Sequence, residues 1–318
     1  MKTESVASPP IGSNVSAWKR LRSRLWKDRY LLLLGFPGLA YFLVYKYAPM
    51  FGLYLAFVEF NPFQGVFGSE WVGLQHFRRI FEDTEVTRVL INTLYLSFLQ
   101  IAFAFPMPIL FALMLNEVRN QVYKRVVQSI IYLPHFLSWV VVVGIWIIFF
   151  RGEGLVNVFL KEAFGMDPVP FMTDPAFFKP MVVTQVIWKE AGWGTIIFLA
   201  ALAGVNPNLY EAAVMDGAGR FRQIWHITLP AIRSTIVIML ILRLGTVLDS
   251  GFEQVFLMLN PLNEENQNVL DTFVFFKGIE QSDYSFATAV GMFKGVVGLV
   301  LVMAANQLAK KFGEEGVY

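Results

Sequence analysis

Six long apolar segments separated by polar stretches constrain the fold of this chain more than any other feature. They lie at about residues 31–49, 89–115, 127–150, 181–203, 232–256 and 286–309. About 20 apolar residues suffice for a helix to cross the hydrocarbon core of a bilayer, and a helix satisfies its backbone hydrogen bonds internally. The sequence therefore predicts an all-α membrane protein with six transmembrane helices.

The composition agrees with that class and excludes others. The chain is 56% hydrophobic and 16% charged, whereas soluble domains are about 45–50% apolar and about 25% charged. The absence of cysteine excludes a disulfide framework and thiolate metal sites. The three histidines are scattered, so we expect no metal site and no nucleophile–His–acid set. The chain is therefore not expected to be an enzyme or to bind nucleic acid.

The distribution of cationic residues predicts the topology. Six spans place both termini on one side, and the segments of that side hold 15 lysines and arginines against 8 on the other. Because cytoplasmic loops carry the excess of Lys and Arg, both termini are expected in the cytoplasm. The polar stretch between the fourth and fifth spans is then cytoplasmic too.

That polar stretch, residues 206–230, has the pattern of two short helices. Asn206 followed by Pro207 is a helix start, and Gly217 and Gly219 end the helix. Phe221, Ile224, Trp225 and Thr228 then recur at helical spacing, which is typical of a second helix at the membrane surface.

The same stretch resembles the EAA loop of ATP-binding-cassette (ABC) importer permeases. The resemblance rests on nine residues at the spacing of that family: Glu211, Ala212, Ala213, Asp216, Gly217, Ala218, Gly219, Leu229 and Pro230. In that family the helix docks on the ATP-hydrolysing subunit and transmits its motion. The resemblance thus implies a coupling role for Glu211, Ala212, Ala213, Asp216 and Gly217.

Three further motifs resemble the carbohydrate branch of these permeases, and the last of them resembles a subgroup for breakdown products of complex, often acidic, plant or algal polysaccharides. They are Trp71-Val72-Gly73-Leu74, Tyr132-Leu133-Pro134-His135, and Gly251-Phe252-Glu253-Gln254 with Asn260-Pro261. The resemblance implies the type I ABC importer fold, with a permease core at 86–310 that contains the EAA loop at 206–230. Residues 1–30 are then a cytoplasmic tail, 31–85 an accessory helix with an outer interfacial segment, and 311–318 a second tail.

The resemblance also implies the partners and the location. Similar importers combine two permease subunits, here expected to be different chains, with two ATPase subunits and an extracytoplasmic solute-binding protein in the bacterial plasma membrane. No Gly-x-x-x-x-Gly-Lys-Ser/Thr sequence occurs in this chain. ATP and Mg are therefore expected on the partner ATPase, and this chain itself needs no cofactor.

Charged residues inside the predicted spans are candidates for substrate contact, since charges at membrane depth usually face a cavity or one another. Lys189 and Trp193 share a face of the fourth span, and Arg243, Ser250 and Glu253 follow helical spacing on the fifth. With Glu190 and Asp249 they form the predicted substrate set: Lys189, Glu190, Trp193, Arg243, Asp249, Ser250 and Glu253. Charged groups suit sugar hydroxyls and carboxylates, and indole suits their C–H faces.

A second interpretation of the same residues remains open. Lys189, Arg243, Asp249 and Glu253 can instead form ion pairs that fix helix packing. Lys294 lies in the sixth span between Gly291 and Gly295, a spacing that favours close helix packing.

Two other classes of function compete with the importer. An ion-gradient-driven secondary transporter could use Glu190, Asp249 and Glu253 as cation or proton sites, but such folds often show internal repeats and none is evident in the sequence. An intramembrane enzyme would need a catalytic constellation at membrane depth, and the sequence shows none.

Overall fold

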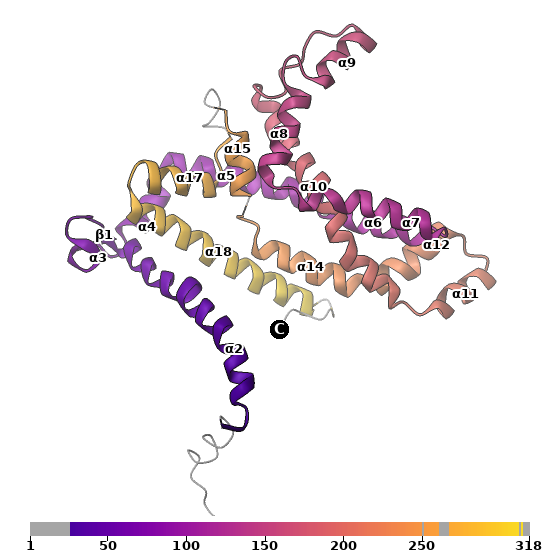
Figure 1. Cartoon of the computed structure of the whole chain (residues 1–318), viewed down its shortest axis with the longest axis horizontal. Coiled ribbons are helices and arrows are strands. Elements are labelled where there is room, and N and C mark those ends of the chain that lie inside the picture. Colours follow the sequence, from indigo (N-terminus) through magenta and orange to yellow (C-terminus); the bar gives the residue numbers. More distant parts are fainter. Residues whose placement is uncertain (1–25, 250, 261–266, 312, 314–318) are drawn as a thin grey trace, which may run out of the picture. The chain divides into compact units, whose positions relative to one another are not determined.

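The computed structural model describes residues 26–249, 251–260, 267–311 and 313, and helices dominate it (Figure 1). The first half contains α2 (Arg29–Phe42), α3 (Gly65–Gly68), α4 (Gln75–Glu82), α5 (Thr84–Leu99), α6 (Pro106–Glu117), α7 (Gln121–Tyr132), α8 (Trp139–Phe150) and α9 (Leu155–Phe164). The second half contains α10 (Pro175–Ala203), α11 (Pro207–Met215), α12 (Arg220–Gln223), α13 (Leu229–Ala231), α14 (Arg233–Gly245), α15 (Phe252–Met258), α17 (Leu270–Phe275) and α18 (Tyr284–Lys311).

Short π or 3₁₀ stretches, labelled η, continue or join these helices. They are η1 (Leu43–Tyr47), η2 (Ala48–Phe57), η3 (Gln100–Ala104), η4 (Leu133–Phe136), η5 (Ile224–Thr228) and η6 (Phe276–Glu280). Several precede a proline, because a proline lacks the N–H of the regular helical ladder. In η3, for example, the N–H of Phe105 bonds to the carbonyl of Gln100 at 3.0 Å, just before Pro106.

The chain divides into two compact units, at Tyr54 and Leu55. In the first unit, α2 continues through η1 into η2, where the helix tightens near Pro49. The second unit, from Leu55 onward, contains all the remaining elements.

The second unit opens with a small module, from β1 to α4, that includes the only β-structure among the described residues. The strands β1 (Val58–Glu59) and β2 (Glu70–Trp71) pair antiparallel, with Val58 opposite Trp71. Helix α4 follows and buries His76 and Ile80. The sequence predicted an interfacial segment here but not the strands, since two-residue strands leave no periodic pattern.

Five helical segments among the described residues are long and apolar enough to cross a membrane. They are Arg29–Phe57, Thr84–Glu117, Trp139–Phe164, Pro175–Ala203 and Tyr284–Lys311. A sixth crossing results if Arg220–Ala231 and Arg233–Gly245, bent by 61° at their junction, form one span. The predicted multi-span helical class is therefore confirmed.

Two predicted spans are interrupted. The span at 127–150 is broken after α7, because η4 begins beside Pro134 and the Ser138 side chain then caps α8, accepting from the N–H of Val141 at 3.4 Å. The span at 232–256 ends as a regular helix at Gly245 and resumes at Phe252, after Gly251 with a φ of +78°. A continuous fifth helix was thus a wrong prediction.

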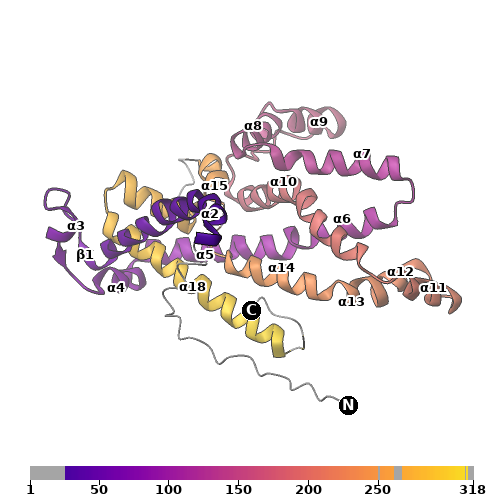
Figure 2. The ribbon, with the colours of Figure 1, turned by 60° about the horizontal axis from the view of Figure 1, so that its bottom comes forward.

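Close packing of α10 against α7 and η4 forms one wall of the second unit, and α6 packs beside α10 (Figure 2). At Gly192 an added Cβ would lie 1.8 Å from the Ile131 carbonyl oxygen, so only glycine permits this approach. Buried residues of α5, α8, α10 and α15 then form a common apolar core that includes Leu96, Val143, Val182 and Val255.

A second close contact joins α14 and α18, which lie side by side (Figure 1). A Cβ on Gly298 would lie 3.0 Å from the Gly245 carbonyl oxygen, and a Cβ on Gly245 would lie 2.6 Å from Val302. Gly291 and Gly295 would meet no atom within 4 Å. The predicted Gly-x-x-x-Gly packing is therefore wrong within this chain, where the contact lies at Gly298 instead.

Candidate functional site

Lys189, in the middle of α10, turns its side chain toward η4. Its Nζ donates to the carbonyl oxygens of His135 at 2.6 Å and Leu137 at 2.7 Å, and it lies 3.6 Å from Glu190 Oε1. The residue is only 7% exposed. Because an ammonium group has three N–H donors, these three contacts leave it no donor for a further partner. The geometry favours a positioning role, in which Lys189 holds the break between α7 and α8 against α10.

Beside Lys189, three side chains form a partly exposed surface that we call the α10 platform: His135, Glu190 and Trp193. The His135 and Trp193 rings stack with centroids 4.4 Å apart and planes 4° apart. Nδ1 of His135 lies 2.8 Å from Glu190 Oε2, and because an ionised carboxylate only accepts, Nδ1 donates. Trp193 is 44% exposed. An exposed indole and a carboxylate, each in contact with His135, suit a sugar ring with hydroxyl donors.

Arg243 lies in the last turn of α14 and donates from Nη2 to Gln100 Oε1 in η3. The guanidinium also interacts electrostatically with Asp249 and with Glu190 of the α10 platform. One hydrogen bond leaves several of the five guanidinium donors for other acceptors. Arg243 is therefore the sequence-predicted cation that retains donors for a ligand.

Asp249 is engaged within the chain. It lies between α14 and α15, and its carboxylate pairs with Lys294 of α18, which also pairs with Asp271 of α17. Asp271 was not predicted as a partner, because the polar composition around it indicated a loop between the fifth and sixth spans. Nothing in a single sequence shows that α17 returns beside α18.

Glu253 is exposed, and its side chain makes no hydrogen bond or ion pair in the part of the chain that the structure describes. Because the helix breaks after Gly245, Arg243 and Glu253 do not share a continuous helical face, and that spacing argument was wrong. Ser250 lies outside the described residues.

His135 and Gln100 were also missed by the sequence reasoning. His135 reaches the α10 platform only because η4 breaks the helix at Pro134, which redirects the side chain toward α10. The adjacent Pro134 signalled a break but not its direction. Gln100 lies in the π stretch η3, where helical spacing shifts by one residue and the regular period misplaces side chains.

The predicted coupling segment forms a short exposed helix, α11, followed by a tight turn. The Asn206 side chain caps α11, accepting from the N–H of Asn208 at 3.0 Å. Gly217 has a φ of +75°, and the N–H of Ala218 closes the turn onto the carbonyl of Ala213 at 2.8 Å. The Tyr210 hydroxyl lies 3.0 Å from Thr228 Oγ1, which fixes α11 to η5.

The outer surface of this segment offers groups for a partner. Glu211, Ala212 and Asp216 are exposed, and neither carboxylate is paired within the described chain. Large apolar side chains are exposed around them: Leu209, Val214, Met215, Phe221 and Trp225. A short helix with unpaired acids and exposed apolar side chains is what a docking element presents.

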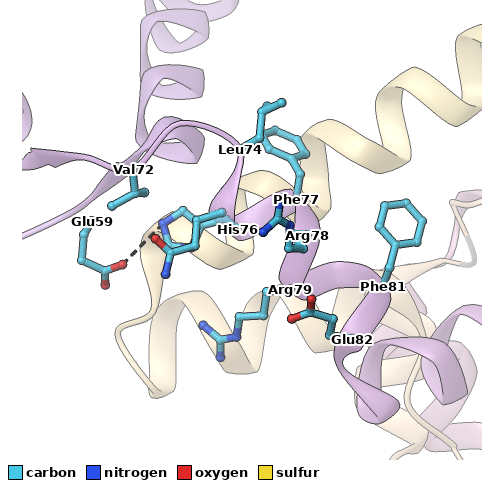
Figure 3. A pocket seen from close by; sticks show the side chains of 10 residues that line it. Glu59, Val72, Leu74, His76, Phe77, Arg78, Arg79, Phe81 and Glu82 are labelled. Carbon is cyan, nitrogen blue, oxygen red and sulfur yellow. Dashed lines mark ion pairs between the residues drawn. The ribbon is translucent and has the colours of Figure 1, made fainter.

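A groove of about 890 Å³ runs along α4 in the module from β1 to α4 (Figure 3). His76 is among the residues that line it, with Nε2 3.1 Å from the Val58 carbonyl oxygen and 3.5 Å from Glu59. None of the predicted substrate residues lines it. Among the described residues, no group of three or more His, Cys, Asp or Glu side chains could hold a metal ion.

Residues 104–313 match the family described as "Binding-protein-dependent transport system inner membrane component". The chain is 50% identical to the polygalacturonan/rhamnogalacturonan transport system permease protein YteP of Bacillus subtilis. The alignment covers the full length of both chains. It is 52% identical to protein LplB of the same organism, over 92% of each chain.

Solved structures give the same result. The fold superposes with a TM-score of 0.85 and 40% identity on a chain of a bacterial alginate ABC transporter in complex with an alginate pentasaccharide-bound periplasmic protein, covering 94% of this chain and 100% of that one. A second structure, of an ABC transporter involved in the import of the acidic polysaccharide alginate, gives 0.84 at 41% identity, covering 92% and 99%. The predicted ABC permease fold is thereby confirmed, and the chain belongs to the inner-membrane components of binding-protein-dependent ABC transport systems.

Proposed function

We propose that this chain is a permease subunit of an ATP-driven, binding-protein-dependent importer of acidic oligosaccharides in the bacterial plasma membrane. The observation that carries the proposal is the match of nearly the whole chain, at 40–50% identity, to permeases named for polygalacturonan/rhamnogalacturonan and alginate transport. In this proposal the chain forms half of the translocation pathway, and a second, different permease forms the other half.

The candidate site supports an acidic sugar as substrate. Trp193 and His135 offer stacked ring faces, and Arg243 retains guanidinium donors for a carboxylate. Glu190 and the exposed Glu253 supply acceptors for sugar hydroxyls, with Asp249 and Ser250 nearby in sequence. Lys189 acts indirectly, by holding His135 in place.

Coupling to ATP hydrolysis is assigned to α11. The importer would contain two ATPase subunits, which bind ATP and Mg. Each ATPase would hold the α11 helix of one permease subunit in a groove on its surface. The exposed carboxylate of Glu211 would meet a basic group there, while Ala212, Ala213, Asp216 and Gly217 keep the surface compact. An extracytoplasmic binding protein delivers the sugar to the permease. Closure of the ATPase dimer moves α11 and switches the helix bundle between inward- and outward-facing states.

The class of transporter is tested by purifying the complex through a tag on this chain after co-expression with its genomic neighbours. We expect a second permease, two ATPase copies, and ATP-dependent uptake of binding-protein-delivered oligogalacturonides in proteoliposomes. Uptake that follows an imposed ion gradient and ignores ATP would favour the secondary transporter instead.

The substrate site is tested by Arg243→Gln. Losing charge-assisted hydrogen bonds of about 1.5–3 kcal/mol should weaken the apparent affinity for an acidic oligosaccharide about 10- to 100-fold. ATPase activity stimulated by loaded binding protein measures this. The control is Arg78→Gln, which removes an exposed cation with no described partner. Equal loss in both variants, or none in either, would contradict the role of Arg243.

A further inference from the structure

Lys294 is placed where a lone cation would be most costly. It lies ten residues after the start of α18, about 15 Å along the helix, which is close to half of an approximately 30 Å hydrocarbon core. Its side chain is only 17% exposed. A lysine at such depth needs partners, and it has two, the carboxylates of Asp249 and Asp271.

The two acids come from different elements. Asp271 lies in the first turn of α17, between Leu270 and Thr272, which are both fully buried. Asp249 lies in the interruption between α14 and α15, the interrupted fifth span. Lys294 thus ties this interruption and α17 to the continuous helix α18.

The two contacts differ in exposure. The Asp271 side chain is 22% exposed, and α17 is also fixed by the N–H of Leu270, which donates to Thr93 Oγ1 at 2.9 Å. The Asp249 side chain is 55% exposed. A cavity of about 260 Å³, also lined by Gly291 and Gly295, lies beside all three charged side chains. The greater exposure of Asp249, rather than this shared cavity, distinguishes its contact from that of Asp271.

Charge balance makes the contact at Asp249 sensitive to its surroundings. Lys294 alone leaves one excess negative charge on the two acids, and the charge of Arg243 also attracts Asp249. Asp249 is thus shared between two cations, one in α14 and one in α18. Any anion that engages Arg243 would change the balance at Asp249.

We propose that Lys294 is a positioning residue that pins the interrupted membrane helix α14–α15, with Asp249 as the releasable end of the contact and Asp271 as the fixed end. Gly291 and Gly295 bring no side chain into the cavity beside this cluster, which leaves room for a change in its contacts. This assigns to Lys294 a role in holding one conformation of the permease rather than in contacting substrate.

Hydrogen exchange of the purified complex, read by mass spectrometry, tests the proposal. Three turn hydrogen bonds protect the amides of Thr246, Val247 and Asp249. In Asp249→Asn we expect these amides to exchange about five-fold faster, the factor that corresponds to about 1 kcal/mol. Asp271→Asn should leave them protected and change the amides of α17 instead. Glu280→Gln, which removes an exposed acid with no described partner, should change neither region.

Lys294→Gln leaves the carboxylates of Asp249 and Asp271 without the lysine that pairs with both of them, and this can block assembly. The neutral pair Asp271→Asn with Lys294→Gln avoids this and should deprotect Thr246 to Asp249 as Asp249→Asn does. Unchanged exchange there in both variants would overturn the proposal. Equal deprotection of both regions by Asp249→Asn and Asp271→Asn would overturn the assignment of fixed and releasable ends.

A second readout is ATP hydrolysis in the absence of binding protein, which should rise in Asp249→Asn because the pinned conformation is less populated. This readout rests on the proposed function, whereas the exchange experiment does not. Changed exchange without any ATP hydrolysis would retain the role of Lys294 and count against the proposed function.

Discussion

At the scale of single residues, two glycines in the predicted coupling segment have different conformations although they lie two positions apart. Gly217 has a φ of +75°, in the left-handed region that side chains other than glycine rarely adopt. Gly219 has a φ of −68°, and an added Cβ there would meet nothing within 4 Å. The backbone therefore requires glycine only at Gly217.

This difference yields a matched pair of variants. Gly217→Ala should strain the turn after α11 by about 1–2 kcal/mol and reduce ATP-dependent transport, because the turn sets the position of Glu211. Gly219→Ala should leave transport near its native level. Uptake in proteoliposomes measures both, and equal activity of the two variants would refute the requirement for this turn.

Lys189 shows how burial decides between two interpretations of one charge. Lys189→Met leaves the carbonyls of His135 and Leu137 without their donor. The complex should lose about 1–3 kcal/mol of stability, seen as a lower thermal midpoint, while the apparent affinity for substrate changes little. A large loss of affinity at unchanged midpoint would instead make Lys189 a substrate ligand.

At the scale of elements, the molecule depends on a few close helix approaches. Helix α10 meets the end of α7 at Gly192, and α14 meets α18 at Gly245 and Gly298. Membrane helices gain little from hydrophobic transfer to one another, so close van der Waals packing and hydrogen bonds decide their association. Small residues at these points fix which helices become neighbours.

Gly192→Ala should therefore disrupt the packing of α10 against α7, since its Cβ would lie 1.8 Å from a backbone oxygen of Ile131. We expect a large loss of assembled protein, measured by size-exclusion chromatography of a fluorescent fusion in detergent. Gly144→Ala on α8 is the control, because its Cβ meets no atom within 4 Å. Native yield for Gly192→Ala would show that this packing is not required.

At the scale of the whole molecule, many large apolar side chains are exposed on the described part of the chain. Lipid covers those that face the bilayer, but Leu209, Val214, Met215, Phe221 and Trp225 surround a polar segment at α11 and η5. Exposed apolar groups beside unpaired acids mark a surface for another protein. In the proposed assembly that protein is the ATPase.

Co-expression tests this surface in the intact protein. The tagged chain produced with its ATPase should remain monodisperse in detergent, whereas the chain produced alone should aggregate. Met215→Ser should improve the solubility of the chain alone and weaken the capture of the ATPase. Undiminished capture would mean that the ATPase binds elsewhere.

The apolar runs alone determined the class of this protein, because a stretch long enough to span a bilayer can be counted directly. The short patterns Asn206-Pro207 and Gly217 also predicted the start and end of α11 correctly, since capping depends on neighbouring residues only. The nine-residue resemblance at the same place predicted the family, which the comparisons confirm. The cytoplasmic orientation of the termini remains a prediction from charge counting.

Only the tertiary structure decided which charges meet. Lys189 donates to the carbonyls of His135 in η4 and of Leu137 just after it, and Lys294 pairs with Asp249 in a helix break and with Asp271 on α17. These contacts join residues from different elements, through breaks at Pro134 and Gly245 that shift every later side chain out of a regular period. A sequence pattern shows that a charged residue lies in an apolar segment and therefore needs a partner. It does not show which residue is that partner, because helix packing determines which side chains come close.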